Sequence, residues 1–358
     1  MTRDSTAGTA RTGRSRRNFA GSRPVMDDVA RLAGVSKQTV SRVLNEHPAV
    51  RPETREQVLA AMRTLDYRPS QSARSLASGR TRMLGVISFD AAEYGPAATL
   101  TAINGAALDA GYLVSSIALT TADRSTVVRA VDRLTADGAA GLIVIAPQKW
   151  VADAMPEACS VNTPLVMLES DLGHGSPLVT ADSGSGTRMA TEHLLALGHS
   201  TVQLVAGPAG WIAAEHRLES WRATLLAAGA EVPEPLFGDW SADSGYELGR
   251  RLAARPDVTA VFAANDQMAL GVLRALHEAG RRVPADVSVV GYDDIPEAAH
   301  MLPPLTTVRT EFAEVGRRCL RLLLEQLDGE WERHVRSVVP VELIVRSSTG
   351  PAPGAGAR

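Results

Sequence analysis

Short apolar runs rich in β-branched residues alternate with amphipathic segments of helical period over most of the chain. The runs that we predict as strands are 84–89, 113–119, 141–145, 165–168, 202–205, 260–263 and 287–291. Helical segments fall between them, which is typical of parallel sheets covered by helices on both faces. The length of this region suits two such sheets better than one. The pattern therefore predicts an α/β core of two doubly wound parallel-sheet subdomains.

Polar and small residues follow several of these runs directly. Ligands in open parallel sheets bind beyond the carboxyl ends of the strands. The residues expected at that edge are Asp90, Pro147, Glu169, Gly207, Asn265 and Asp293.

The segment from Met26 to Leu65 has a helical period instead and predicts three short helices. Asp27 is the expected N-cap of the first helix, Gly34 ends it, and Ser36 caps the second. Pro52 opens the third in its first turn. Such a run predicts an all-α helix-turn-helix headpiece that precedes the core.

The second of these helices has two distinct faces. Val40, Val43 and Leu44 form an apolar face, and the opposite face presents Lys37, Gln38, Ser41 and Arg42. The second helix of a helix-turn-helix lies in the major groove, where Gln can bond adenine and Arg or Lys can bond guanine. The alternative is a solvated face on an ordinary helical hairpin.

Charge is distributed unevenly along the 358 residues, whose formal net charge is -3. Residues 1–80 contain 15 Lys and Arg against 7 Asp and Glu, whereas the remainder contains 22 against 33. A basic end on an acidic body suggests a nucleic-acid arm, the alternative being a charged tail that aids solubility.

The stretch from Arg68 to Arg80 joins the headpiece to the core. A helix of about two turns is marginal in water by itself, so we expect it to fold only when bound. Leu76 stands there among Arg and Ser residues. Its side chain either opens a base step in the minor groove or contacts the body of the protein.

The sequence contains little that indicates an enzyme, a metal site or a membrane span. Ser183 to Gly186 lacks the spacing of a nucleophile elbow or a phosphate-binding loop, and His193 and His199 are six residues apart, unsuitable for joint metal ligation from one helical face. The two cysteines, Cys159 and Cys319, form no metal or disulfide pattern, and no apolar run approaches about 18 residues. We therefore expect no enzyme, no cofactor and no membrane partner, and a cytoplasmic, nucleoid-associated location.

The string from Val29 to Asn45 resembles the helix-turn-helix of the LacI/GalR family of bacterial transcription regulators. Further motifs of that family follow in order, namely LLALGH at 194–199, LVAGP at 204–208, GDWSADSG at 238–245, ANDQMALG at 264–271, SVVGYDD at 288–294 and PPLTT at 303–307. The resemblance covers about residues 25 to 346.

The resemblance implies a headpiece, a hinge helix and a periplasmic-binding-protein-like core with a sugar between its subdomains. The expected division is a disordered basic arm (1–24), the headpiece (25–69), the hinge helix and linker (70–80) and the sugar-binding and dimerisation core (81–346). A tail rich in Gly, Pro and Ala (347–358) is expected to be disordered, and it lacks the leucine heptads of a four-helix coiled coil. A palindromic operator needs two headpieces, so a homodimer is expected.

The resemblance also implies roles for individual residues. The residues expected to bind DNA are Ser36, Lys37, Gln38, Thr39, Arg42 and Asn45, with Leu76 as the minor-groove wedge. Arg217, Asn265 and Asp293 match positions that hydrogen-bond sugar hydroxyls, and Trp240 and Phe312 match positions that pack against the sugar. Phe89, Asp90 and Glu169 come from the first subdomain and are expected to complete the effector site.

Some of these positions depart from the sugar-responsive family member that the chain most resembles. Glu169 replaces an Asp, Ile145 replaces an Asn, and Phe89, Asp90 and Trp211 also differ. The expected effector is a β-galactoside, with another hexoside or a larger disaccharide as alternatives.

The predicted function is repression of a sugar-utilisation operon that the sugar relieves by releasing the protein from operator DNA. A corepressor-dependent repressor or an activator would use the same parts. A sugar-binding transport receptor is a remote alternative, because it would need an export signal and no headpiece.

Overall fold

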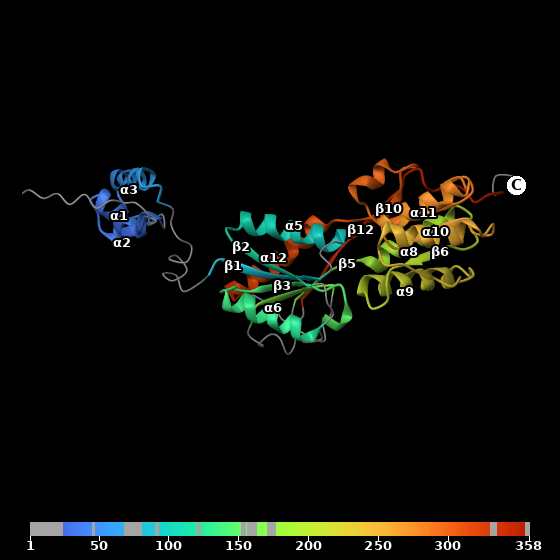
Figure 1. Ribbon diagram of the computed structural model, residues 1–358, viewed down its shortest axis with the longest axis horizontal. Coiled ribbons are helices and arrows are strands. Elements are labelled where there is room, and N and C mark those ends of the chain that lie inside the picture. Colours follow the sequence, from blue (N-terminus) through green and yellow to red (C-terminus); the bar gives the residue numbers. More distant parts are fainter. Residues whose placement is uncertain are drawn as a thin grey trace, which may run out of the picture. The chain divides into compact units, whose positions relative to one another are not determined.

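The computed structural model describes residues 24–44, 47–67, 81–89, 93–119, 123–151, 155, 163–169, 177–329 and 335–354. They belong to two compact units, Met1–Gly79 and Arg80–Arg358, whose helices and strands are labelled in Figure 1. The predicted residues Asn45, Leu76 and Asp90 lie outside the described residues.

The first unit consists of three helices, α1 (Met26–Leu32), α2 (Lys37–Leu44) and α3 (Pro52–Thr64). Their shared core contains the fully buried Val29, Val40 and Val58. The expected cap at Asp27 is wrong, because α1 begins one residue before it. Asp28 instead accepts a hydrogen bond from the backbone N–H of Val25 at 3.0 Å.

The second unit contains two six-stranded sheets. The first sheet has the order β11-β5-β4-β3-β1-β2 and is parallel throughout. Its strands are β1 (Met83–Phe89), β2 (Leu113–Leu119), β3 (Leu142–Ile145), β4 (Leu165–Leu168), β5 (Leu178–Ala181) and β11 (Arg336–Val339). Helices α5 (Tyr94–Asp109) and α12 (Phe312–Asp328) cover one face, and α6 (Arg124–Ala136) packs on the other.

The second sheet has the order β12-β10-β9-β8-β6-β7. Its strands are β6 (Gln203–Ala206), β7 (Leu236–Phe237), β8 (Ala260–Ala263), β9 (Ser288–Asp293), β10 (Thr306–Thr310) and β12 (Val341–Ile344). The edge strand β12 runs antiparallel to β10, and the other pairs are parallel. One face is covered by α8 (Ser183–Ala196) and α9 (Ile212–Ala227), the other by α10 (Ala242–Ala253) and α11 (Asp266–Glu278), and a 3₁₀ helix, η1 (Pro296–His300), follows β9.

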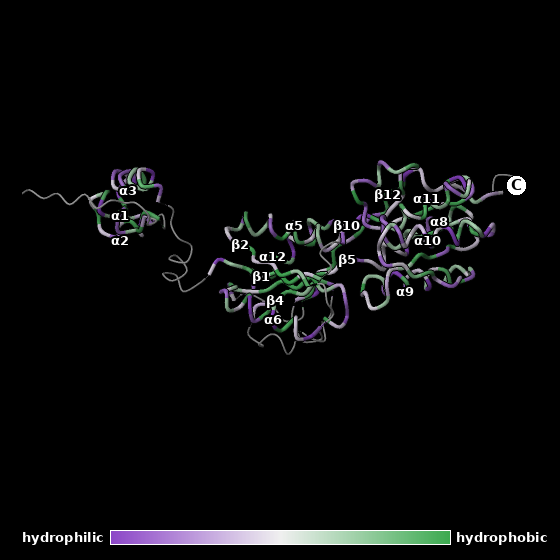
Figure 2. Tube along the Cα trace, viewed as in Figure 1, coloured by the Kyte–Doolittle hydropathy of each residue, from purple (hydrophilic) through white to green (hydrophobic). Residues whose placement is uncertain are grey.

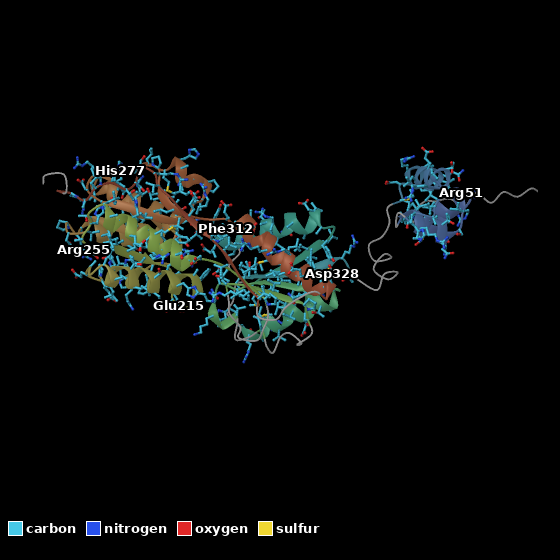
Figure 3. The ribbon with its side chains drawn as sticks, turned by 180° about the vertical axis from the view of Figure 1, so that it is seen from behind. Arg51, Glu215, Arg255, His277, Phe312 and Asp328 are labelled. Atoms are coloured by element: carbon cyan, nitrogen blue, oxygen red, sulfur yellow. The ribbon has the colours of Figure 1, made fainter. Side chains whose placement is uncertain are left out.

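The sheet interiors are apolar, as their parallel strands require. Strands β1 and β4 run through the hydrophobic part of the first sheet (Figure 2). Exposed polar residues such as Arg255 and His277 lie on the outside of the second subdomain, whereas Phe312 lies between the two subdomains (Figure 3). Among the described residues, no helix is long and apolar enough to cross a membrane.

The chain passes between the two subdomains at three short connections within the described residues. The first joins β5 to α8, the second joins β10 to α12, and the third joins β11 to β12. Each connection is one residue long. A change in the angle between the subdomains must therefore be absorbed in or next to these three places.

Part of the segment expected to be a disordered tail is packed instead. The Ser348 side chain is fully buried, and its hydroxyl donates to the carbonyl of Val289 at 2.6 Å and accepts from the N–H of Thr306 at 2.7 Å. The carbonyl of Gly350 lies 3.2 Å from Nε2 of the buried His199. Residues 348–350 are therefore built into the edge of the second subdomain.

Candidate functional site: an interdomain pocket and a recognition helix

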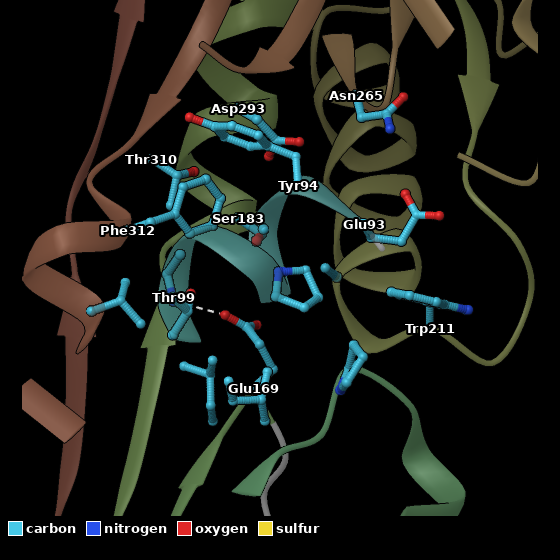
Figure 4. A pocket seen from close by; sticks show the side chains of 18 of the residues that line it. Glu93, Tyr94, Thr99, Glu169, Ser183, Trp211, Asn265, Asp293, Thr310 and Phe312 are labelled. Atoms are coloured by element: carbon cyan, nitrogen blue, oxygen red, sulfur yellow. Dashed lines mark hydrogen bonds between the residues drawn. The ribbon is translucent and has the colours of Figure 1, made fainter. Parts of the chain in front are cut away.

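A pocket lies between the two subdomains, at the carboxyl ends of their parallel strands (Figure 4). We call it the interdomain pocket. Its empty space, including the part open to solvent, is about 740 Å³. It is lined by Glu93, Tyr94, Gly95, Pro96, Thr99, Ile145, Pro147, Leu168, Glu169, Ala181, Ser183, Trp211, Ala213, Arg217, Trp240, Asn265, Asp293, Thr310, Phe312 and Val315.

Two of the three interdomain connections contribute directly to this pocket. Ala181 and Ser183 flank the first connection, and Thr310 and Phe312 flank the second. Thr310 is buried, and its hydroxyl has no hydrogen-bond partner among the described residues. A molecule in the pocket would therefore touch the segments that must absorb any change in the angle between the subdomains.

The loops opposite these connections also join the subdomains through the backbone. The N–H of Ile212 donates to the carbonyl of Pro147 at 2.9 Å, and the N–H of Lys149 donates to the carbonyl of Gly210 at 3.3 Å. Trp211 lies between these two bonds and lines the pocket. The pocket is thus closed on this side by contacts that a subdomain movement would break.

Arg217 is the central cation of the pocket. It projects from α9 and is only 8% exposed. Its guanidinium lies 3.6 Å from the ring centre of Tyr292 and 5.7 Å from that of Trp240. Nη1 donates to the carbonyl of Ala264, and Nη2 lies 3.6 Å from Oδ1 of Asp293. Nε is buried without a partner among the described residues, so it remains a donor for a ligand.

Asp293 ends β9 and faces Arg217. Burial raises the pKa of Asp293 to about 6, although the Arg217 charge acts in the opposite direction. Behind it lies the fully buried Asp266, which accepts from the N–H of Ile295 at 2.9 Å and from the hydroxyl of Thr307 at 2.6 Å. Burial, assisted by the charge of Asp293, raises the pKa of Asp266 to about 8. The second subdomain therefore contains two carboxyl groups that titrate near neutral pH.

Glu169 directly follows β4 and belongs to the first subdomain. Its carboxylate accepts from the N–H of Ala181 at 3.1 Å and from the hydroxyl of Thr180 at 3.1 Å. Burial raises the pKa of Glu169 above its ordinary value, while these two hydrogen bonds lower it. Two neutral donors thus fix the carboxylate in place beside the first connection.

Two pairs of aromatic rings line the pocket. Trp211 and Trp240 meet edge to face with ring centres 5.5 Å apart, and Tyr94 and Phe312 do so at 5.6 Å. The indole Nε1 of Trp240 is buried without a partner among the described residues. A Cβ at Gly207 would lie 2.2 Å from the Trp240 ring, so only glycine fits beneath it. The rings offer apolar faces to the C–H surfaces of a small ligand.

Three residues of the pocket have left-handed backbone conformations. Their φ angles are 69° for Glu169, 74° for Trp240 and 107° for Asp293. Each costs about 1 to 3 kcal/mol for a residue other than glycine, and such residues cluster at functional sites. The amide of Asn265 helps to hold this geometry, because its Nδ2 donates to the carbonyl of Trp240 at 2.9 Å and its Oδ1 caps α11. The surrounding fold imposes these side-chain directions.

Most of the residues predicted for the effector site meet in this pocket. Glu169, Arg217, Trp240, Asn265, Asp293 and Phe312 all line it. Phe89 does not. Its ring is 1% exposed and packs edge to face with Trp150 at 5.2 Å, inside the first subdomain. Phe89 is therefore a core residue, because the side chain at the end of β1 points into the packing between the sheet and its helices.

The sequence reasoning also missed residues of the pocket. Glu93, Tyr94 and Thr99 come from the start of α5, and Ser183 and Thr310 flank the connections. These helix starts share the edge at which the parallel strands end, so the first turn of such a helix lies beside the residues that directly follow the strands.

The headpiece presents the predicted recognition face on α2. Lys37, Gln38 and Arg42 are exposed, whereas Val40 and Val43 are buried against the other helices. The hydroxyl of Ser36 accepts from the N–H of Thr39 at 3.1 Å and so caps α2, as expected from the sequence. The structure thus separates a packing face from a face of donors and cations.

Comparison with known proteins gives matches in both units. Residues 25–70 match the model of bacterial regulatory proteins of the lacI family, and residues 191–349 match that of a periplasmic binding protein-like domain. The chain is 37% identical over 328 residues to the lactose operon repressor of Escherichia coli (strain K12), over 90% of this chain and 89% of that protein. It is 37% identical over 340 residues to the HTH-type transcriptional regulator CelR of Thermobifida fusca, over 91% of this chain and 98% of that protein.

Solved structures agree with these matches. The lac repressor dimer bound to operator and the anti-inducer ONPF superposes with a TM-score of 0.85 at 36% identity, covering 92% of this chain and 100% of that chain. A complex of the transcriptional regulator CelR with cellobiose gives a TM-score of 0.68 at 35% identity, covering 91% and 100%. The helix-turn-helix headpiece, the two parallel-sheet subdomains and these similarities show that the chain belongs to the lacI family of bacterial regulatory proteins.

Proposed function

We propose that the protein represses a sugar-utilisation operon and that a small glycoside in the interdomain pocket releases it from its operator. The main support is the position of the pocket, since its lining comes from both subdomains and from two of the connections between them. A ligand shifts a conformational equilibrium only by its difference in affinity for the two states. A ligand that touches both subdomains is placed to have such a difference.

The chemistry of the pocket fits a sugar. Arg217 and Trp240 each have a buried N–H without a partner among the described residues, and Asp293 provides acceptors beside them. Vicinal hydroxyls suit such a set of donors and acceptors, and the aromatic rings suit the apolar faces of a pyranose. We propose Glu169, Arg217, Trp240, Asn265, Asp293 and Phe312 as the effector-binding residues, and Lys37, Gln38 and Arg42 as the residues that read the operator.

The effector that we propose is a β-galactoside or a related glycoside. Two pairs of aromatic rings in one pocket favour a ligand with two rings, and the similar regulator CelR has been solved with cellobiose. Ile145 is apolar and Glu169 is longer than aspartate, which favours a change in the hydroxyl pattern that is recognised. The same parts would serve a corepressor if the ligand preferred the operator-binding conformer.

Operator release distinguishes these possibilities. The full-length protein, bound to the DNA upstream of its own gene, is titrated with galactosides, glucosides and their disaccharides. We expect one glycoside to lower DNA affinity at concentrations that also change tryptophan fluorescence. A glycoside that raised DNA affinity would indicate a corepressor, and no response to any sugar would contradict the proposed effector class.

A further inference from the structure

An ion pair on the surface of the headpiece joins two of its helices. The ammonium of Lys37, the first residue of α2, lies 2.7 Å from Oδ2 of Asp27 in the first turn of α1. The Lys37 side chain is 62% exposed and that of Asp27 is 48% exposed. The pair is therefore on the surface, at the start of the helix that we propose to enter the major groove.

The neighbouring carboxylate, that of Asp28, makes different contacts. Asp28 accepts from the N–H of Val25 at 3.0 Å and pairs with Arg31 at 3.1 Å, so it caps and stabilises α1. Asp27 makes no such capping bond among the described residues, and its recorded partner there is Lys37. Of the two consecutive aspartates, Asp28 thus caps α1 and Asp27 contacts the proposed recognition helix α2.

A contribution to folding stability does not explain the Asp27–Lys37 ion pair. Exposed ion pairs contribute little to folding, because water screens them and both side chains lose freedom. A carboxylate beside a DNA-binding face also repels phosphates and lowers general affinity for DNA. A residue that adds little stability and opposes binding is best explained by an effect on where Lys37 points.

We infer that Asp27 is a positioning residue that aims the Lys37 ammonium at one base and keeps it from neighbouring phosphates. An unpaired lysine carries a compact positive charge on a long flexible side chain, so it readily contacts any phosphate within reach. Held by Asp27, the ammonium keeps its remaining N–H donors for acceptors such as guanine O6 and N7. Asp27 therefore exchanges affinity for selectivity. The inference rests on the proposed role of α2 in reading the operator.

The experiment compares Asp27→Asn with wild type in the full-length protein. Preferred sites are selected from random DNA, and affinities are then measured for the preferred site, for its single-base variants and for random DNA. We expect Asp27→Asn to bind random DNA more tightly, with a steeper salt dependence, and to lose up to about fivefold of its discrimination at one base pair of each half-site, which is the most that an exposed ion pair supplies. Asp27→Glu should restore part of that discrimination.

Asp28→Asn is the matched control, because it removes the same charge one residue away and keeps an oxygen that can cap Val25. It should raise general affinity and leave base preference unchanged. In the Lys37→Ala background, Asp27→Asn should no longer alter discrimination at that base pair.

The outcomes distinguish the positioning role of Asp27 from the proposed role of α2 in reading the operator. If Lys37→Ala changes base preference and Asp27→Asn does not, the positioning role of Asp27 is wrong while α2 remains the recognition helix. If Lys37→Ala also leaves every base preference unchanged, Lys37 does not read the operator, and the inference falls with that proposal.

Discussion

Replacement of Arg217 by methionine tests the effector site with little disturbance of packing. Arg217 lies between the rings of Tyr292 and Trp240, and a methionine side chain can occupy much of the space of its apolar stem. The substitution removes the guanidinium that lowers the pKa of Asp293. The pKa of Asp293 should then rise above about 6, so the carboxyl group takes up a proton near neutral pH and avoids a buried uncompensated charge.

The size of the effect follows from the hydrogen bonds that the guanidinium can offer. A fork to two hydroxyls is worth about 2 to 4 kcal/mol after desolvation losses, if each charge-assisted bond contributes about 1.5 to 3 before them. The sugar concentration needed for operator release should therefore rise roughly 30- to 700-fold. Operator affinity without sugar should stay close to that of wild type, because the hydrogen bond, ion pair and ring contacts of Arg217 all lie within the second subdomain and do not join it to the first.

The assay is operator release measured by DNA anisotropy, with tryptophan fluorescence followed in the same titration. Arg222→Met is a suitable control, because it removes an arginine from the same helix outside the pocket. A sugar that released wild type and Arg217→Met at the same concentration would show that the effector binds elsewhere.

Three further predictions concern stability and DNA recognition. Because burial raises the pKa of Asp266 from 3.8 to about 8, the native state holds a proton that the unfolded chain releases, and stability should fall as pH rises between these values, by up to about 1.4 kcal/mol per pH unit. Asp266→Asn should lose that slope in urea unfolding at pH 6 and pH 8, and an unchanged slope would exclude Asp266 as its source. Removal of residues 347–358 should cost about 2 to 4 kcal/mol of unfolding free energy, because the buried Val289 carbonyl and Thr306 N–H lose the Ser348 hydroxyl as their partner. The expected dimer should survive this truncation, and sedimentation that showed a dimeric wild type and a dissociated truncated protein would contradict that. Arg42→Ala should reduce preference for operator over random DNA by about 1 to 3 kcal/mol, and equal preference would refute the proposed contact to a base.

The sequence was a good guide wherever a local pattern determines structure. Alternating apolar runs predicted the central strands, and a capping serine at Ser36 with a left-handed Gly34 marked the turn of the headpiece. Motifs such as that around Asn265 placed most of the pocket, because residues that follow parallel strands must meet at one edge.

The positions of other residues depend on contacts between segments that are far apart in the sequence, and these could not be predicted. Thr310 and Ser183 reach the pocket because the chain crosses between subdomains beside them, and no local pattern reveals such a crossing. Phe89 follows the family position at the end of its strand, yet its large ring packs inward against Trp150. Ser348 stands in a stretch whose Gly, Pro and Ala content predicts disorder, but buried acceptors and donors on two distant strands fix it in place.

The central claim is that sugar and operator act on one conformational equilibrium. Such coupling is reciprocal, so the factor by which saturating sugar weakens operator binding must equal the product of the factors by which operator weakens sugar binding at the two sites of the expected dimer. Both can be measured on the full-length protein, the first by DNA anisotropy with and without saturating sugar, the second by calorimetry with and without saturating operator. We predict that the operator ratio exceeds one and equals the product of the sugar ratios at the two sites. In Arg217→Met the operator ratio should fall to about one at sugar concentrations that saturate wild type. Sugar that bound the interdomain pocket with the same affinity in the presence and absence of operator would contradict the account.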